Sequence, residues 1–240
     1  MIDSRWKLYR ERALDLVQRT RARFLSPIAR DAYEARIRRD AFQTIAQEGR
    51  WGGICRSGWG STLENTRATR EVVETVVRGF GIRSMVDAAC GDFSWMPLVL
   101  ERLPENFRYI GCDIVPELIA RNGASYPRRE FRVLDFVLDE MPQCDLILCR
   151  DALQHLPVAG IKKALENFSR SGAKFLLAST HLRKFGWRNA RDKRVGQCRD
   201  RNLLLEPFNL TDPIVLYSEQ DAAHKFLGLW KLPLTYLDHR

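Results

Sequence analysis

The chain has 240 residues, of which 45% are hydrophobic, which is enough for one globular domain with a full core and a short extension. No stretch approaches the roughly 18 uninterrupted apolar residues of a membrane span, and the first residues lack the apolar core of a signal peptide. We therefore expect a cytoplasmic protein. The formal net charge of +9 indicates a surface that attracts anions.

The positive charge is concentrated in two segments. Residues 1–40 carry a net charge of +5 and residues 183–201 one of +6, which leaves the rest of the chain close to neutral. The second segment also contains Phe185 and Trp187, and aromatic residues with arginine are common in sugar and phosphate recognition. RNA, an anionic membrane surface and an acidic substrate are candidate partners, and a solvated basic surface is the alternative.

The six cysteines form neither C-x-x-C pairs nor a framework typical of secreted domains. Four of them lie in or beside predicted strands, where a thiol behaves as a small hydrophobic group. We therefore expect reduced, mostly buried cysteines and no bound metal. The six are Cys55, Cys90, Cys112, Cys144, Cys149 and Cys198.

A basic helical extension is predicted over residues 1–50. From Ser4 to about Ala46, apolar residues recur at helical spacing among arginines. Ser26-Pro27 divides this pattern into two helices, because the residue before a proline avoids helical backbone angles. The extension is a candidate lid over a ligand pocket, dimer element or membrane-surface helix.

Residues 52–61 are too rich in glycine for a helix or a packed strand. The helix expected after them begins near Thr62, carries Val72, Val76 and neighbouring valines on one face, and ends at Gly79 to Gly81. This amphipathic helix is expected to pack on a sheet.

The central stretch of the sequence combines two strands and a tight turn. Ser84 to Ala89 predicts a buried strand, Cys90 to Asp92 a turn followed by a helix, and Arg108 to Cys112 a second strand that ends before Asp113. This is half of a nucleotide-binding βαβ unit. In such a unit, backbone N–H groups of the turn approach a ligand, and an acidic residue about 20 positions later accepts both hydroxyls of a ribose.

Strands and helices continue to alternate through the rest of the chain. The expected elements are a helix over 116–122, strands over 131–134 and 145–149, a helix over 158–168, and strands over 174–179, 213–217 and 226–232. This alternation implies an α/β fold with a parallel, doubly wound sheet covered by helices on both faces.

The turn after the first strand is poor in glycine. A dinucleotide site needs G-x-G-x-x-G, and here only Gly91 is present, with Ala89 and Phe93 where glycines are expected. Asp87 and Asp92 beside the turn would repel a pyrophosphate but suit a ligand with an ammonium or sulfonium group. The turn therefore favours a cationic ligand over a dinucleotide.

Residues 87–96, Asp135-Phe136 and residues 149–156 form an ordered set of motifs. The first resembles motif I of the class I S-adenosylmethionine-dependent methyltransferases, and the set resembles a bacterial branch with a D-x-x-C-G-D-F-x-W-M signature. The resemblance covers roughly Gly52 to the C-terminus. It implies a methyltransferase domain over 51–240, with S-adenosylmethionine as cofactor. It also implies a Rossmann-like, seven-stranded, mostly parallel sheet whose last pair includes an antiparallel strand.

Cofactor-binding residues follow from the strand ends and from the resemblance. Asp113 would bind the ribose, and Asp135 and Phe136 the adenine. In the resembled proteins a segment at the place of 52–61 closes over the methionine end, where Arg56 would pair with the carboxylate. A helix cap for Asp113, a turn residue for Asp135 and a plain loop for 52–61 are the alternatives. The full set is Arg56, Ser61, Asp87, Ala89, Cys90, Gly91, Asp113, Ile114, Asp135, Phe136 and Arg150, with Ser57 an alternative to Ser61.

Candidate catalytic residues follow the fourth and fifth strands. Methyl transfer is an in-line displacement, so the enzyme mainly aligns the nucleophile and excludes water. A hydroxyl acceptor also needs a base, for which His155 and His181 are candidates, with Asp151 orienting one of them or serving as the base itself. An amine acceptor needs no base, and a histidine that only caps or packs is the alternative.

The predicted function is transfer of a methyl group from S-adenosylmethionine to an oxygen of a small-molecule or carbohydrate-like acceptor. RNA methylation is one alternative, but nucleic acid is not favoured because residues 149–152 lack an N-P-P-Y-type motif and no RNA-binding domain is added. A cofactor-binding subunit without transferase activity is the other. A homodimer and peripheral contact with an anionic membrane are compatible with the charge pattern.

Overall fold

The computed structural model describes residues 24–50, 52, 57–183, 189, 191–219 and 224–237. The predictions for Arg56, for Phe185 and Trp187, and for the first N-terminal helix lie outside these residues. Among the described residues, no helix combines the length and apolar character needed to span a membrane.

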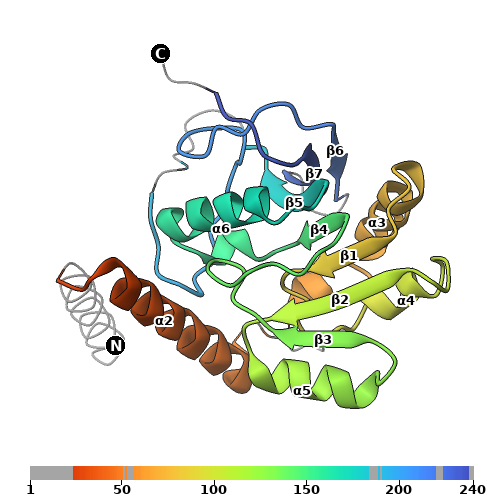
Figure 1. Ribbon diagram of the computed structural model, residues 1–240, viewed down its shortest axis with the longest axis horizontal. Helices are drawn as coiled ribbons and strands as arrows, with labels where there is room; N and C mark the ends of the chain where they lie inside the picture. Colours follow the sequence, from red (N-terminus) through yellow and green to blue (C-terminus); the bar gives the residue numbers. More distant parts are fainter. Residues whose placement is uncertain are drawn as a thin grey trace.

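Seven strands form one sheet in the order β3-β2-β1-β4-β5-β7-β6 (Figure 1). Strands β1 to β5 pair in parallel, and β7 is antiparallel to both β5 and β6. The expected seven-stranded, mostly parallel sheet is confirmed. Its order reverses between β1 and β4, where open α/β sheets bind ligands beyond the carboxyl ends of the strands. The strands are β1 (Ser84–Asp87), β2 (Arg108–Asp113), β3 (Glu130–Val133), β4 (Leu146–Cys149), β5 (Phe175–His181), β6 (Val215–Ser218) and β7 (Lys225–Lys231).

Helices cover both faces of this sheet (Figure 1). Helices α3 and α4 pack on one face and α6 on the other, while α5 lies along β2 and β3. The helices are α2 (Pro27–Glu48), α3 (Arg67–Gly79), α4 (Met96–Leu100), α5 (Pro116–Ser125) and α6 (Val158–Arg170), with 3-10 turns η1 (Trp59–Ser61) and η2 (Leu153–His155).

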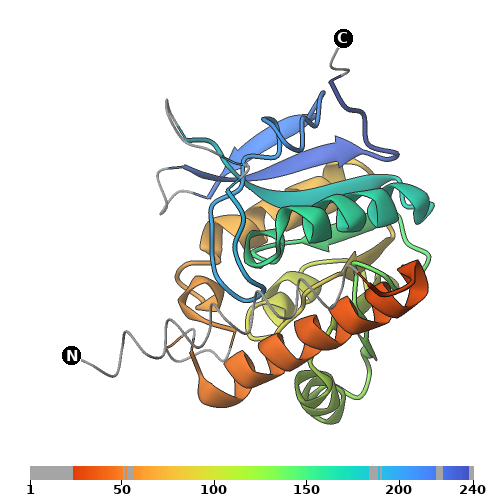
Figure 2. The ribbon, with the colours of Figure 1, turned by 90° about the vertical axis from the view of Figure 1, so that its left-hand side faces the viewer.

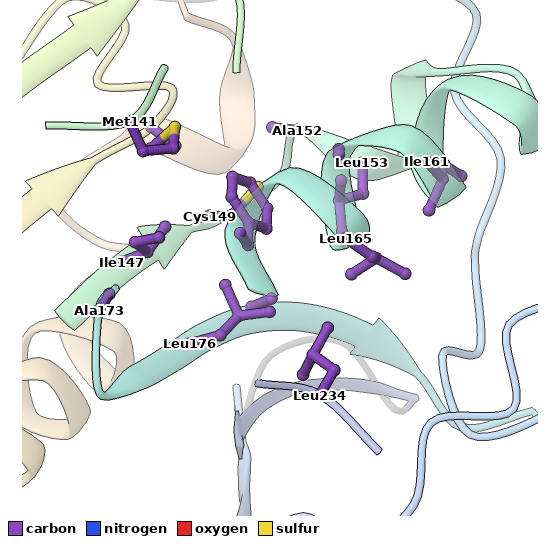
Figure 3. Close-up of a cluster of buried hydrophobic side chains, with 14 of the residues drawn as sticks. Met141, Ile147, Cys149, Ala152, Leu153, Ile161, Leu165, Ala173, Leu176 and Leu234 are labelled. Carbon is purple, nitrogen blue, oxygen red and sulfur yellow. The ribbon is translucent and has the colours of Figure 1, made fainter. Parts of the chain in front are cut away.

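Two apolar clusters form the core, one on each face of the sheet. Successive strand residues point to opposite faces, so Ile147 joins the cluster under α6 while Leu148 joins the one under α3 and α4. Figure 3 shows side chains of the first cluster, which includes Ile161 and Leu165 of α6 and Leu176 of β5. The two-sided burial explains why the central strands are continuous apolar runs.

Helix α2 crosses the edge of the sheet at which β1 to β4 end (Figure 2). It starts at Pro27, where the sequence predicts a helix boundary, and it ends before Gly49, whose φ of 60° is left-handed. Only Arg38 and Ile45 of its 22 residues are buried. Polar contacts therefore provide much of its attachment to the domain.

The polar contacts of α2 reach two other helices of the domain. Lys163 Nζ of α6 lies 2.7 Å from Asp31 Oδ1 and 3.0 Å from Glu34 Oε2. At the other end, Gln43 Nε2 donates to Glu117 Oε1 of α5 at 2.7 Å. The helix thus spans the domain from α6 to α5.

The helix predicted after the first turn is present, but it begins later than expected. Phe93 has a φ of 57°, which a right-handed helix cannot accommodate, and α4 begins only at Met96. The Phe93 ring instead packs against Tyr109, Tyr126 and Phe131, with centroids 4.8 to 5.3 Å apart. Aromatic packing under the turn therefore takes the place of a first helical turn.

Candidate functional site

A cavity lies at the carboxyl ends of β1 to β4, and its empty volume, including the part open to solvent, is about 960 Å³. Most residues predicted to form the site line it, whereas His181 does not, and Arg56 lies outside the described residues. The predicted residues in its wall are Ser57, Ser61, Asp87, Ala89, Cys90, Gly91, Asp113, Ile114, Asp135, Phe136, Arg150, Asp151 and His155.

The turn after β1 is held close to the segment that precedes η1. Gly91 has a φ of 56°, and a Cβ at this position would lie 2.2 Å from Ser57 Oγ, so a larger residue would collide with Ser57. Ser57 Oγ also accepts a hydrogen bond from Asp92 N at 2.7 Å. The one glycine of the motif is therefore required by this close approach.

Asp113 ends β2 and faces the turn. Its Oδ2 accepts from Gly91 N and its Oδ1 from Val115 N, both at 3.0 Å. Each oxygen retains a further lone pair, so the carboxylate can still accept two ligand hydroxyls. Burial raises the pKa of Asp113, and the bonds from Val115 and Gly91 oppose that rise.

Asp87, the last residue of β1, is almost fully buried under the turn. Its Oδ2 accepts a hydrogen bond from the Tyr109 hydroxyl at 3.1 Å. Burial raises the pKa of Asp87 to about 7, because it removes water from the carboxylate, and the hydrogen bond from Tyr109 opposes only part of that rise. A cationic ligand beside it would favour the ionised form.

Asp135, which follows β3, forms a buried ion pair with α2. Its Oδ2 lies 2.9 Å from Arg38 Nε and 2.7 Å from Arg38 Nη2, and its Oδ1 accepts from Val137 N at 3.1 Å. Phe136 beside it packs on Phe168, with ring centroids 5.7 Å apart. Asp135 thus connects the cavity wall to α2.

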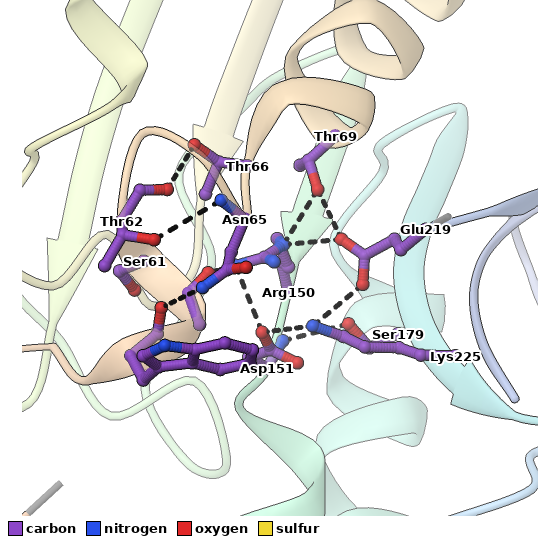
Figure 4. Close-up of polar contacts among 12 residues, drawn as sticks. Ser61, Thr62, Asn65, Thr66, Thr69, Arg150, Asp151, Ser179, Glu219 and Lys225 are labelled. Carbon is purple, nitrogen blue, oxygen red and sulfur yellow. Dashed lines mark hydrogen bonds and ion pairs between the residues drawn. The ribbon is translucent and has the colours of Figure 1, made fainter. Parts of the chain in front are cut away.

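The tip of β4 carries a network of charges (Figure 4). Arg150 is buried, and its Nε donates to Glu219 Oε1 at 2.7 Å while its Nη1 lies 3.0 Å from Asp151 Oδ2. Lys225 Nζ lies 2.5 Å from Asp151 Oδ2 and 2.8 Å from Glu219 Oε2. Thr69 donates to Glu219, and its own Oγ1 accepts from Arg150 Nε at 3.1 Å.

These cations decide the ionisation of the acidic groups at the β4 tip. Burial alone would raise the pKa of Asp151, but Arg150 and Lys225 outweigh it and lower that pKa to about 2. The same two cations lower the pKa of Glu219 against the effect of burial. Both carboxylates are therefore ionised at neutral pH.

The two candidate histidines occupy different surroundings. His155 lines the cavity, and the edge of its ring meets Phe42 of α2 at a centroid distance of 6.4 Å. Burial lowers the pKa of His155 to about 4, so its imidazole is neutral near pH 7. His181 is buried away from the cavity wall, with Nδ1 3.3 Å from Arg201 O. His181 is the last residue of β5 and lies beside Arg201 instead.

Three functional candidates were not predicted: Arg38, Glu219 and Lys225. Nothing in the sequence separates Arg38 from the exposed Arg39 beside it. The position of Lys225 could have been predicted from the sequence. Lys225 begins an antiparallel strand, and such a strand starts at the edge of the sheet where the neighbouring parallel strand ends. Among the described residues, no group of His, Cys, Asp or Glu is arranged to hold a metal.

No model of a known protein family matches the sequence, and no curated protein matches it. Solved structures do match the fold. The 1,6-didemethyltoxoflavin N1-methyltransferase of Burkholderia thailandensis, with bound S-adenosylhomocysteine, gives a TM-score of 0.58 at 15% identity over 87% of this chain and 91% of its own.

Two further structures show the same likeness. The magnesium protoporphyrin IX methyltransferase of Synechocystis PCC 6803, with bound S-adenosylmethionine, gives a TM-score of 0.55 at 14% identity over 82% of this chain and 96% of its own. The N-methyltransferase NodS of Bradyrhizobium japonicum WM9 gives 0.55 at 15% identity over 80% and 98%. The chain therefore has the fold of the class I S-adenosylmethionine-dependent methyltransferases.

Proposed function

We propose that the protein transfers a methyl group from S-adenosylmethionine to a hydroxyl of a small-molecule or carbohydrate-like acceptor. One observation carries the proposal: Asp135, Asp113, Asp87 and Asp151 lie at the carboxyl ends of four neighbouring strands, β3, β2, β1 and β4, and line one cavity. Neighbouring strands lie about 4.8 Å apart, so this row spans roughly 14 Å. An elongated ligand with several polar groups fits such a row.

We assign each part of the cofactor to one strand end of this row. Asp113 accepts from the ribose hydroxyls, and Asp135 and Phe136 hold the adenine. Asp87 and the turn from Ala89 to Gly91 face the positively charged methionine end. The solved methyltransferases of the same fold, with bound S-adenosylmethionine or S-adenosylhomocysteine, support the choice of S-adenosylmethionine as the ligand.

Two features support an oxygen acceptor. His155 lines the cavity, and burial lowers its pKa to about 4, so the imidazole is in the neutral form that can accept a proton, although the low pKa makes it a weak base. Asp151 is a weaker base still, because its pKa is about 2. In this mechanism His155 removes the proton, and α2 covers the cavity as a lid that excludes water.

Calorimetric titration tests the proposal. The purified chain is titrated with S-adenosylmethionine and, separately, with NAD as a matched nucleotide control. Micromolar binding of S-adenosylmethionine alone is expected, after which acceptors are screened among glycans, small hydroxylated molecules and RNA. Binding of NAD alone, or of neither compound, would contradict the proposal.

A further inference from the structure

Two large apolar side chains are exposed at the start of α2. Among the described residues, Phe24 and Ile28 are the most exposed large hydrophobic residues, with 86% and 84% of their surfaces accessible to solvent. Isolated exposed apolar side chains are common on proteins, whereas apolar side chains that gather at one place mark interaction sites. The sequence that precedes these two residues therefore decides whether they belong to a larger apolar surface.

The sequence before Phe24 contains a row of apolar residues. They recur at alternating intervals of four and three, which is the spacing of one face of a helix. The row includes an indole and a phenol ring, and such rings favour the boundary between a lipid bilayer and water. Its members are Ile2, Trp6, Tyr9, Ala13 and Leu16.

Positive charge borders this apolar row. Seven of residues 1–23 are Lys or Arg and three are Asp or Glu, which gives a net charge of +4. On a helical projection of about 100° per residue, arginines flank the row on both sides, whereas Glu11 and Asp15 fall opposite it. The flanking residues are Arg5, Arg12 and Arg19 on one side and Arg10 and Arg21 on the other. An apolar face bordered by cations is typical of segments that bind anionic membrane surfaces.

Charge and composition favour a lipid surface over two other partners. A second copy of the chain carries the same positive charge in this segment, so the two segments would repel one another. RNA would pair with the arginines but would leave aliphatic side chains such as Leu16 and Ile28 in water, because bases stack on aromatic rings and guanidinium groups. An anionic bilayer surface accommodates the apolar row and compensates the cations together.

Helix α2 connects this segment to the cavity. Near its start, Asp31 Oδ1 lies 2.7 Å from Lys163 Nζ of α6, which attaches this end to the domain. Phe42, fourteen positions after Ile28 on the same helix, lines the cavity. At 1.5 Å per residue, this separation along the helix is roughly 21 Å. A surface bound at the start of α2 is therefore close to the cavity wall.

We propose that residues 1–28 bind an anionic membrane surface. The apolar row, Phe24 and Ile28 insert between the lipid headgroups, and the arginines pair with the lipid phosphates. The protein is then attached to one side of the bilayer without crossing it, and the cavity faces acceptors held at that surface. The attachment does not involve the cofactor, so it is measured without S-adenosylmethionine.

Vesicle co-sedimentation tests the attachment. The unaltered chain is mixed with vesicles of phosphatidylcholine alone and with vesicles in which about one third of the lipid is phosphatidylglycerol. Binding to the anionic vesicles is expected to be about tenfold tighter or more, and to weaken with added salt, because salt screens the attraction between arginines and lipid phosphates. Absence of binding to the anionic vesicles, or equal binding to both compositions, would overturn the proposal.

Ile28→Glu tests the apolar contact. The side chain is exposed and lies in the first turn of α2, where a carboxylate is favourable, so the variant is expected to fold. Its affinity for the anionic vesicles is expected to fall about tenfold or more, since an apolar contact is lost and a charge that the lipid repels is added. Leu98→Glu, at an exposed position of α4, is the control and should bind as the unaltered chain does. Equal losses in the two variants would refute a contact at the start of α2.

Arg12→Gln combined with Arg19→Gln tests the contribution of charge. Loss of two cations beside the apolar row is expected to weaken binding to the anionic vesicles about tenfold or more. The control, Arg121→Gln combined with Arg128→Gln, removes the same charge from exposed positions on and after α5, which contacts the other end of α2. An equal loss in the two double variants would show that only the net charge of the protein matters, and would refute a specific role of residues 1–28.

Two further measurements examine the other partners. Sedimentation equilibrium is expected to show no dimer that depends on Ile28, and a dimer that Ile28→Glu dissociates would assign the apolar side chains to a second copy of the chain. Titration with a single-stranded RNA is expected to show weaker binding than the anionic vesicles do. Binding of the RNA without binding of the vesicles would assign the cations to nucleic acid and overturn the proposal.

Discussion

Asp113 and Asp151 lie two strands apart in the same cavity wall, yet their environments are opposite. Backbone N–H groups of Gly91 and Val115 hold Asp113, and its pKa is raised by burial. Arg150 and Lys225 hold Asp151, and they lower its pKa to about 2 against burial. The presence of a paired cation, rather than the degree of burial, decides whether the pKa of each carboxyl group is raised or lowered.

The difference separates two kinds of binding surface. At Asp113 a local turn presents a carboxylate with lone pairs for neutral hydroxyls, which suits a ribose. At Asp151 four charged groups from distant parts of the chain compensate one another. Changes at the two ends should therefore affect different properties of the protein.

The largest expected effect is a loss of unfolding free energy when the charge network at the β4 end of the cavity is broken. Arg150→Ala leaves Asp151 and Glu219 with a single cation between them, and such an uncompensated buried charge costs about 3 to 5 kcal/mol of unfolding free energy. Urea denaturation followed by tryptophan fluorescence measures the loss.

Arg78→Ala is the control for that measurement. Arg78 pairs with Glu74 one helical turn away at 3.1 Å on an exposed surface, so its loss should cost no more than about 0.5 kcal/mol. Equal losses in the two variants would show that the buried network adds nothing to an ordinary surface pair.

The next effect concerns affinity at the β2 end. Asp113→Ala removes the proposed ribose contact and is expected to weaken S-adenosylmethionine binding by roughly 1.5 to 3 kcal/mol, the range for hydrogen bonds to a charged group. Calorimetry measures the S-adenosylmethionine affinity of Asp113→Ala. Glu105→Ala, which removes an exposed carboxylate in a loop, is the control. An unchanged affinity in a folded Asp113→Ala variant would show that Asp113 does not bind the ribose.

The smallest effect is a pH dependence that originates at Asp87. Its pKa is about 7 in the folded protein against an ordinary value of 3.8, so folding favours the protonated form, and this group's contribution to stability is lost as pH rises towards 7. A cationic cofactor favours the ionised form, so S-adenosylmethionine affinity should rise about tenfold from pH 6 to pH 8, or ~1.4 kcal/mol.

Proton release on binding checks this linkage. Calorimetry in two buffers with different ionisation enthalpies should show up to one proton released near pH 6, and Asp87→Asn should abolish both the release and the pH dependence. A pH dependence that persists in Asp87→Asn would assign it to another group, such as Asp113.

Much of the fold and of the proposed cofactor site could be predicted from the sequence, because both depend on local patterns. Apolar runs alternating with helical periodicity indicate parallel strands, and the residue after each strand necessarily lies at the edge where ligands bind. Asp87, Asp113 and Asp135 could be placed in one cavity for this reason. The turn after β1 was the local exception, because aromatic packing under Phe93 delays the helix.

The sequence by itself determined the strand tips and the residues on them. Only the tertiary structure decided which distant groups meet those tips. Insertion of β7 beside β5 brings Lys225 to Asp151, α2 brings Arg38 to Asp135, and the end of β5 carries His181 away from the cavity wall. The physical reason is that strand order, register and helix docking result from packing over the whole chain. The spacing of residues in the sequence gives information only about residues that are close together along the chain.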